Sequence, residues 1–113
     1  MSRQGFAIIA VAVALPISMA LAEDAPEVPP EILAIEGDVA WGEYLSGECV
    51  TCHSARNAGG GIPRIAGRDT EDIVVALHAY KQNRRVHPIM QMLAGRLSAE
   101  EIAALAAYFN TLD

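Results

Sequence analysis

The chain has little positive charge and few cysteines, and both shortages limit the classes of function that it can have. Its 113 residues carry 8 Lys and Arg against 14 Asp and Glu, which gives a net charge of −6. Nucleic-acid binding calls for a basic surface, so nucleic acid is not an expected partner. An acidic surface favours solubility, or docking to electropositive patches on other proteins. Because only two cysteines are present, no second pair competes with them for a role.

Long apolar runs are scarce as well. The main one, residues 6–15, is shorter than the ~20 residues that span a bilayer, and Pro16 follows it. Arg3 before the run and the small residues Ala20 and Ala22 after it are typical of a secretory signal. We therefore predict that residues 1–22 are a signal peptide, with an uncleaved membrane anchor as the alternative. Cleavage removes Arg3 and leaves 7 basic against 14 acidic residues, a net charge of −7.

The remaining chain is expected to be one all-α domain behind a short arm. Residues 23–36 are acidic and rich in proline, which favours a tether, although Ile32, Leu33 and Ile35 could pack on the domain or on a partner. Residues 37–113 show no useful period-two alternation and no internal repeat. Their small size predicts that a buried apolar cofactor contributes to stability.

Caps and apolar spacing predict where the helices begin. Asp38 is expected to cap a first helix that ends in the cysteine motif, and Asp69 or Thr70 a second. Ser98 and Glu101 form a capping box ahead of the last helix, which has an apolar face.

The middle of the chain is expected to hold one helix between two loops. Its residues Ile73, Leu77 and Tyr80 form one stripe, and His78 points away from that stripe, towards solvent. Pro88 is expected to end this helix, because a residue before proline disfavours the α region. Residues 54–61 and the segment that contains the later methionines are expected to be loops.

Cys49, Cys52 and His53 form the motif Cys-x-x-Cys-His, whose spacing is that of covalent haem attachment. In a helical turn these three positions share a face and can address one flat ligand. Two thioether bonds and one axial imidazole would hold a single haem c. The alternatives are a disulfide, a thioredoxin-like redox pair, which requires a βαβ pattern, and a zinc site, which requires a second ligand pair.

The donor on the other side of the iron decides between electron transfer and small-molecule chemistry. The candidates are Met90, Met92, His78 and His87. Met90 and Met92 point in different directions in regular structure, so they are not both expected to face the iron. Methionine is a soft donor that favours ferrous iron, and its ordinary role is to fill a core.

The chain from Gly37 to Leu112 resembles a class I c-type cytochrome of the short bacterial monohaem type. The resemblance rests on a first helix with Gly42, the cysteine motif, the sequence Pro-Arg-Ile-Ala-Gly at residues 63–67, a methionine segment, and the terminal Leu-Ser-x-Glu-x-Ile helix. It implies a small fold of three to four helices around one haem.

The resemblance also implies roles for individual residues. Met90, eight residues before Ser98, maps onto the axial methionine, with Met92 in reserve. The carbonyl oxygen of Pro63 maps onto the acceptor for the free ring N–H of His53. Gly42 would lie where the first and last helices cross. Arg84 and Arg85 are candidate partners of the haem propionates.

The function expected from this resemblance is a periplasmic carrier of single electrons between redox proteins, not an enzyme in itself. The segment from Pro63 to Met90 and the acidic arm are similar to the cytochrome subunits of flavocytochrome c sulfide dehydrogenases, which implies a flavoprotein partner in sulfur oxidation. The alternatives are a haem enzyme or sensor that opens its sixth site to peroxide or a small gas, and a metal-binding or structural module without haem.

Overall fold

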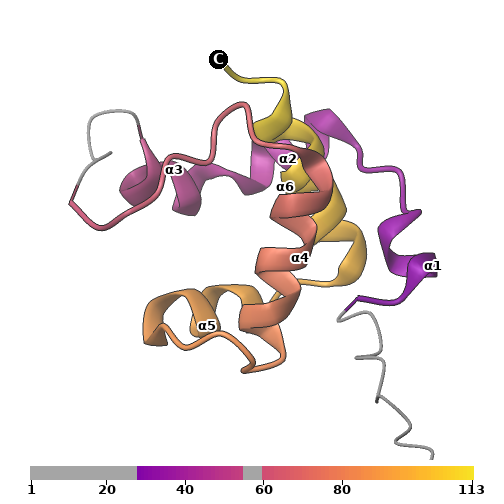
Figure 1. Ribbon diagram of the computed structural model, residues 1–113. Coiled ribbons are helices and arrows are strands. Elements are labelled where there is room, and N and C mark those ends of the chain that lie inside the picture. The colour runs from indigo at the N-terminus through magenta and orange to yellow at the C-terminus, as the bar shows by residue number, and fades with distance from the viewer. Residues whose placement is uncertain (1–27, 55–59) are drawn as a thin grey trace, which may run out of the picture.

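The computed structural model describes residues 28–54 and 60–113, so the predicted signal peptide and most of the predicted loop at residues 54–61 lie outside the described part. Within these ranges the chain forms six helices and no strand (Figure 1). They are α1 (Pro30–Leu33), α2 (Val39–Leu45), α3 (Gly47–His53), α4 (Thr70–Lys81), α5 (Pro88–Gly95) and α6 (Ala99–Asn110). The all-α prediction is confirmed. None of the helices described here combines the length and the hydropathy needed to cross a membrane.

The first and last parts of the domain meet where α2 packs against α6 (Figure 1). Gly42 is buried in this contact, and a Cβ atom built on it would lie 2.0 Å from the Ala104 carbonyl oxygen. The missing side chain therefore lets the two backbones approach closely. At the start of α6, Ser98 Oγ accepts from Glu101 N at 3.1 Å and Glu101 Oε2 accepts from Ser98 N at 2.8 Å, so the predicted capping box is present.

The predicted first helix is two helices that meet at Ser46. Asp38 caps α2 as expected, because its carboxylate accepts a hydrogen bond from Trp41 N at 2.9 Å. Ser46 keeps right-handed helical angles between α2 and α3, and its own hydroxyl donates to the Glu43 carbonyl oxygen at 2.7 Å. The cysteine motif therefore lies on α3, a separate short helix.

Helix α4 begins as predicted and ends earlier than predicted. Asp69 caps it, with its carboxylate 2.9 Å from Glu71 N. The end comes at Lys81, where Asn83 takes the left-handed conformation with φ of 57°. The backbone N–H groups of Asn83 and Arg84 then donate to the carbonyl oxygens of Tyr80 and Ala79, which closes the last turn. Asn83, several residues ahead of the proline, therefore ends the helix.

The segment that carries Met90 and Met92 is a helix, so its prediction as a loop is wrong. Pro88 occupies the first turn of α5, where its fixed φ suits a helix and its missing N–H costs nothing. His87 precedes it in extended conformation and caps the helix, with its Nδ1 accepting from Met90 N at 3.4 Å. Pro88 therefore disfavours helical conformation at the residue before it and itself begins the next helix.

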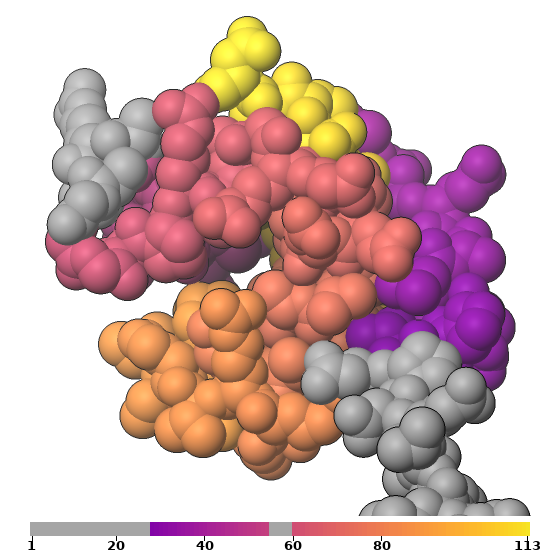
Figure 2. Space-filling model, in the orientation of Figure 1, coloured from indigo at the N-terminus to yellow at the C-terminus, as the bar shows by residue number. Residues whose placement is uncertain are grey.

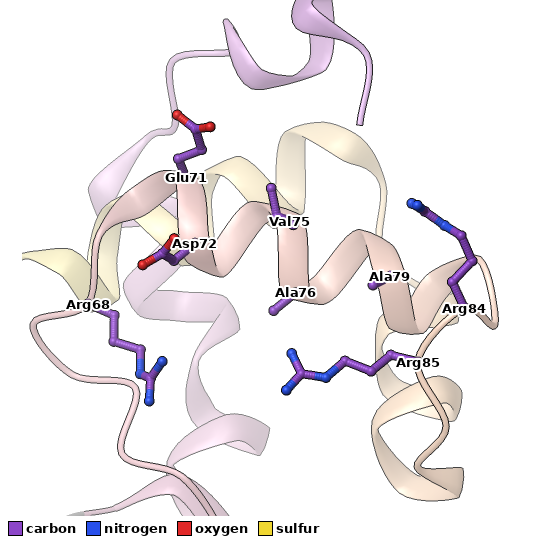
Figure 3. Close-up of a pocket in the computed structure, with 8 residues that line it drawn as sticks. All are labelled: Arg68, Glu71, Asp72, Val75, Ala76, Ala79, Arg84 and Arg85. Atoms are coloured by element: carbon purple, nitrogen blue, oxygen red, sulfur yellow. The ribbon is translucent and has the colours of Figure 1, made fainter. Parts of the chain in front are cut away.

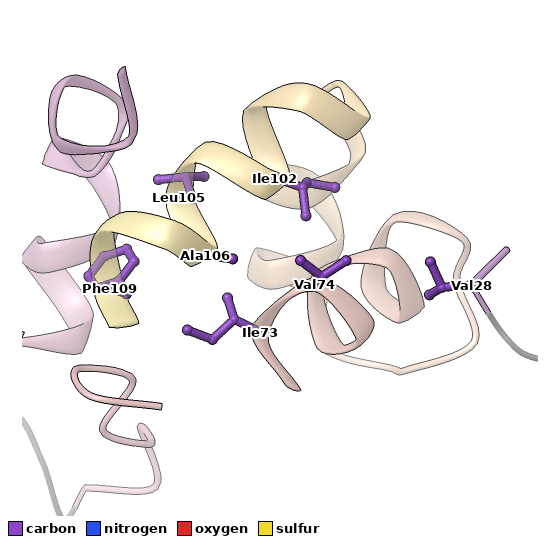
Figure 4. Close-up of a cluster of buried hydrophobic side chains, with 7 residues drawn as sticks. All are labelled: Val28, Ile73, Val74, Ile102, Leu105, Ala106 and Phe109. Atoms are coloured by element: carbon purple, nitrogen blue, oxygen red, sulfur yellow. The ribbon is translucent and has the colours of Figure 1, made fainter. Parts of the chain in front are cut away.

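The described part of the N-terminal arm packs on the domain. Val28 is 2% exposed and belongs to the buried cluster that includes Val74 of α4 and Ile102 of α6 (Figure 4). Ile32 and Leu33 of α1 pack against the same cluster, half-buried. These residues therefore contribute to the core, so the described part of the arm is not a plain tether.

His78 is buried, so its prediction as a solvated side chain is wrong. It lies one turn beyond Val74 on α4 and is 6% exposed. Its Nε2 atom has no hydrogen-bond partner among the residues that the structure describes. The error arises because α4 has two buried faces: Ile73, Leu77 and Tyr80 line a cavity, and the face with Val74 and His78 packs into the core.

This burial predicts a pH-dependent stability that a surface histidine would not give. Desolvation, with smaller contributions from the Lys81 and Arg84 charges, lowers the pKa of the His78 imidazole. Since the folded state binds this proton more weakly than the unfolded state, the stabilisation is complete above about pH 6.5 and is lost as the pH falls. We expect the His78→Phe variant to flatten the acid decline in unfolding free energy by up to about 1.4 kcal/mol per pH unit.

The measurement is guanidinium unfolding of the holoprotein between pH 7.5 and 5, with His87→Asn as the control because His87 is exposed. An unchanged pH slope in the His78→Phe variant would contradict the prediction.

Candidate functional site

One apolar cavity lies between α3, α4 and α5. Its volume is about 380 Å³, within the roughly 300–1,000 Å³ of ligand sites. Figure 2 shows this face hollowed between α5, in orange, and the magenta and pink chain of α3 and the residues after it. Many of the side chains that line it are aliphatic, among them Ile62, Ile65, Ile73, Leu77, Leu93, Leu97 and Leu105. Such a lining suits a flat apolar group.

Cys49 and Cys52 reach this cavity from α3. Both are free thiols, Cys49 half-buried and Cys52 exposed. Burial, and to a lesser extent the nearby Glu48 carboxylate, raises the pKa of the Cys49 thiol. A thioredoxin-like pair needs a thiol whose pKa is lowered, so this environment does not favour thiol exchange. In the described part of the chain, no three His, Cys, Asp or Glu side chains are placed to hold a metal ion, so these residues do not form the alternative zinc site.

His53 is oriented by the loop that follows α3. Its Nδ1 lies 2.8 Å from the Pro63 carbonyl oxygen, at the position that the resemblance implies. A carbonyl oxygen only accepts, so Nδ1 carries the proton and Nε2 keeps its lone pair. His53 and Pro63 both line the cavity. An imidazole held in this way is the usual arrangement of a metal-bound histidine.

The structure separates the four candidates for the second axial donor. Met90 is half-buried and lines the cavity, whereas Met92 is 59% exposed and does not line it. His78 is buried away from the cavity. His87 lines the cavity but its Nδ1 accepts the hydrogen bond from Met90 N. Met90 is therefore the candidate that lines the cavity and whose donor atom, the thioether sulfur, takes no part in capping a helix.

Polar contacts hold α5 across the cavity from α3. Lys81 at the end of α4 donates from Nζ to the Leu97 carbonyl oxygen and, at 3.5 Å, to that of Gly95. Gln91 Nε2 donates to Asn83 Oδ1 at 3.0 Å, and Gln91 Oε1 accepts from the backbone N–H of the α5 cap, His87. These bonds link both ends of α5 to α4 and to the segment after it, which positions Met90.

Two arginines, Arg68 and Arg85, line the cavity. A second hollow, charged, runs along α4, and Figure 3 shows the guanidinium groups of Arg68 and Arg85 on the same side of that helix, with Arg84 apart from them. Arg68 and Arg85 line both hollows, whereas Arg84 lines only the charged one. Sequence reasoning named Arg84 and Arg85 and missed Arg68. The sequence feature that could have indicated Arg68 is its position between the apolar segment 62–67 and the cap of α4, Asp69.

The residues fit the haem that the cysteine motif predicts. Two sulfur atoms, one imidazole with a fixed tautomer and one thioether side chain line the same apolar cavity, with cationic side chains at its rim. Cys49, Cys52 and His53 come from α3 and Met90 from α5, so the chain brings together residues about forty positions apart.

Comparison with known proteins agrees with this site. Residues 39–113 match the family model described as Cytochrome c. The chain is 32% identical over 82 residues to cytochrome c-554(548) of Halomonas halodenitrificans, an alignment that covers 68% of this chain and 99% of that protein.

Two further relatives are named for sulfur metabolism. The chain is 42% identical over 67 residues to a thiosulfate dehydrogenase electron acceptor of Stutzerimonas stutzeri, and 37% identical over 73 residues to a cytochrome subunit of sulfide dehydrogenase of Chlorobaculum tepidum. The alignments cover 57% and 64% of this chain. They span 31% and 66% of those relatives, so this chain matches only part of each.

Proposed function

The chain belongs to the cytochrome c family as a class I c-type cytochrome with an electron-transfer role, and we propose that it is a periplasmic monohaem carrier. In this proposal Cys49 and Cys52 attach haem c covalently, and His53 and Met90 are the two axial donors. The observation that carries it is the cavity, which all four side chains line from two separate helices.

The side chains around the cavity have distinct tasks in this function. Bound haem supplies an iron that accepts and releases one electron. The Pro63 carbonyl oxygen holds the His53 ring so that Nε2 faces the cavity. The aliphatic lining excludes water from the axial side chains. Arg68 and Arg85 provide positive charge at the rim, where it would pair with the haem carboxylates.

The relatives support a place in sulfur oxidation. One is named as the electron acceptor of thiosulfate dehydrogenase and another as a subunit of sulfide dehydrogenase. We propose that this chain accepts electrons from a dehydrogenase that oxidises a reduced sulfur compound, with a flavoprotein as the partner. The predicted signal peptide and the attachment of haem c outside the cytoplasm support a periplasmic location for this exchange.

The experiment is to express the full chain with a haem-attachment system and to examine the purified protein. We expect colour that stays with the polypeptide in acidified organic solvent, a reversible one-electron redox couple, and no reaction of the reduced protein with carbon monoxide at neutral pH. A carrier with both axial positions filled leaves no site for the gas. Carbon monoxide binding would contradict the carrier and favour the haem enzyme or sensor.

The proposed partner has a separate test. Purification from the native source is expected to yield the chain in a one-to-one complex with a flavoprotein. Elution of the chain alone, with reduction by several unrelated donors, would contradict the complex and leave the carrier function intact.

A further inference from the structure

Helix α2 presents two stacked aromatic side chains that are partly exposed at the surface. Trp41 and Tyr44 stack with ring centroids 5.3 Å apart and an interplanar angle of 16°. Trp41 is 46% exposed, Tyr44 76% and Val39, at the start of the helix, 44%. We call Trp41 and Tyr44 the aromatic face. Exposed apolar groups of this kind, rimmed by polar residues, mark protein interaction sites.

The packing of α2 leaves Tyr44 more exposed than Trp41. Gly42 and Leu45 turn towards α6, where Gly42 is buried and Leu45 packs against the main cluster. Trp41, one turn before Leu45, is 46% exposed, whereas Tyr44 is 76% exposed and stacks on it. Their contact therefore pre-organises a stacked surface of which Tyr44 is the more exposed part.

The charge around the aromatic face has one sign. Residues 23–54 contain eight Asp and Glu and no Lys or Arg, whereas residues 55–113 contain six acidic and seven basic residues. Asp38 and Glu43, both exposed, adjoin Trp41 and Tyr44 along the chain and form an acidic rim beside the aromatic face. Asp38 caps α2 through Trp41 N, and its carboxylate stays at the surface.

We propose that the aromatic face and its acidic rim form a docking surface for a basic protein partner that presents arginine. A guanidinium group stacks on tryptophan and tyrosine rings and also pairs with carboxylates, which an ammonium group does less well. Trp, Tyr and Arg are the residues that dominate interface energies. The acidic rim attracts this partner and repels an acidic one. This docking does not depend on which side chain binds the iron.

The chain has one tryptophan, so the indole N–H signal of Trp41 in a nitrogen-15 spectrum reports on this surface alone. The test titrates the reduced holoprotein with a synthetic arginine-rich peptide and with a lysine-rich peptide of the same length and charge. We expect the arginine peptide to shift the Trp41 signal and to bind about two- to fivefold more tightly than the lysine peptide. Binding should weaken as salt is added.

Calorimetry of substituted proteins separates stacking from charge. The double variant Trp41→Leu, Tyr44→Leu should lose the preference for arginine, and Glu43→Gln should weaken both peptides. Val86→Ser, at an 83% exposed apolar position elsewhere, and Glu100→Gln are the matched controls and should change neither. Unchanged haem absorption shows that each variant is folded.

Two results would overturn the proposal. One is that both peptides bind equally tightly and that this binding is unchanged in the double leucine variant. The interaction would then depend on net charge and not on stacking. The other is a Trp41 signal that shifts with protein concentration in the absence of peptide, which would assign the aromatic face to a second copy of the chain.

Discussion

Replacement of Met90 by alanine is expected to open one axial position of the haem iron. The reduced variant should lose the low-spin spectrum of a thioether-bound haem, gain a high-spin component and bind carbon monoxide. Its reduction potential should fall, because a methionine donor favours ferrous iron. We expect a fall of at least about a tenth of the ~0.8 V range over which axial ligands set the reduction potential of haem iron. Absorption spectra and redox titration of the purified protein measure both changes.

The matched control is Met92→Ala, two residues along the same helix. Met92 is 59% exposed and does not line the cavity, so the spectrum, the potential and the refusal of carbon monoxide should stay as in the parent protein. If Met92→Ala alone abolished the thioether signature, the assignment of Met90 would be wrong. The cysteine attachment and the fold would not be affected by that result.

The starts of α2, α4 and α6 are predictable from the sequence because capping is local. Asp38, Asp69 and Ser98 each accept a hydrogen bond from a backbone N–H two or three residues ahead. Such bonds need only the neighbouring residues to form, so the sequence alone contains what determines them. The Cys-x-x-Cys-His motif is local in the same sense, since Cys49, Cys52 and His53 fall within a single helical turn.

The wrong prediction of a loop at α5 concerns residues whose chemistry suits more than one structural role. Pro88 disfavours helix at the residue before it, which predicts the end of one helix, but its fixed φ equally suits the first turn of α5, which it begins. Asn83, which ends α4 by a left-handed turn, gave a weaker signal than the proline. As a result α5, the helix that carries Met90, was expected to be a loop.

Burial contributed by distant residues could not be read from helix periodicity. His78 lies off the predicted apolar stripe, and its burial follows from the second buried face of α4, where Val28 of the arm joins the core. Arg68 reaches the cavity rim because the loop before α4 is tied to the end of α6: Asn110 Nδ2 donates to the Arg68 carbonyl oxygen at 2.8 Å, and Gly67 N donates to that of Phe109 at 2.9 Å. Both facts depend on contacts between residues that lie far apart in sequence.

Replacement of Gly42 by alanine is expected to destabilise the holoprotein strongly. In an exposed helix this change stabilises by about 1 kcal/mol. Here a Cβ atom would lie 2.0 Å from the Ala104 carbonyl oxygen and 2.8 Å from Tyr108 Cβ, and a backbone oxygen cannot turn aside as a flexible side chain does. We expect a loss of about 3 kcal/mol or more, a large part of the ~5–15 kcal/mol of a typical domain. Guanidinium unfolding, followed by haem absorption, measures it.

The same substitution at two other helical glycines distinguishes close packing from a general effect of adding a side chain. Gly47 at the start of α3 and Gly95 at the end of α5 have nothing within 4 Å of a built Cβ atom, and neither has a positive φ. Gly47→Ala and Gly95→Ala should therefore match or exceed the stability of the parent. Since all three changes add the same methyl group, a Gly42→Ala protein as stable as these two would mean that α2 and α6 do not cross in backbone contact. If the crossing is real, separation of α2 from α6 would also shift the connected helix α3, which carries both cysteines, so the fraction of chains with haem attached should fall together with stability.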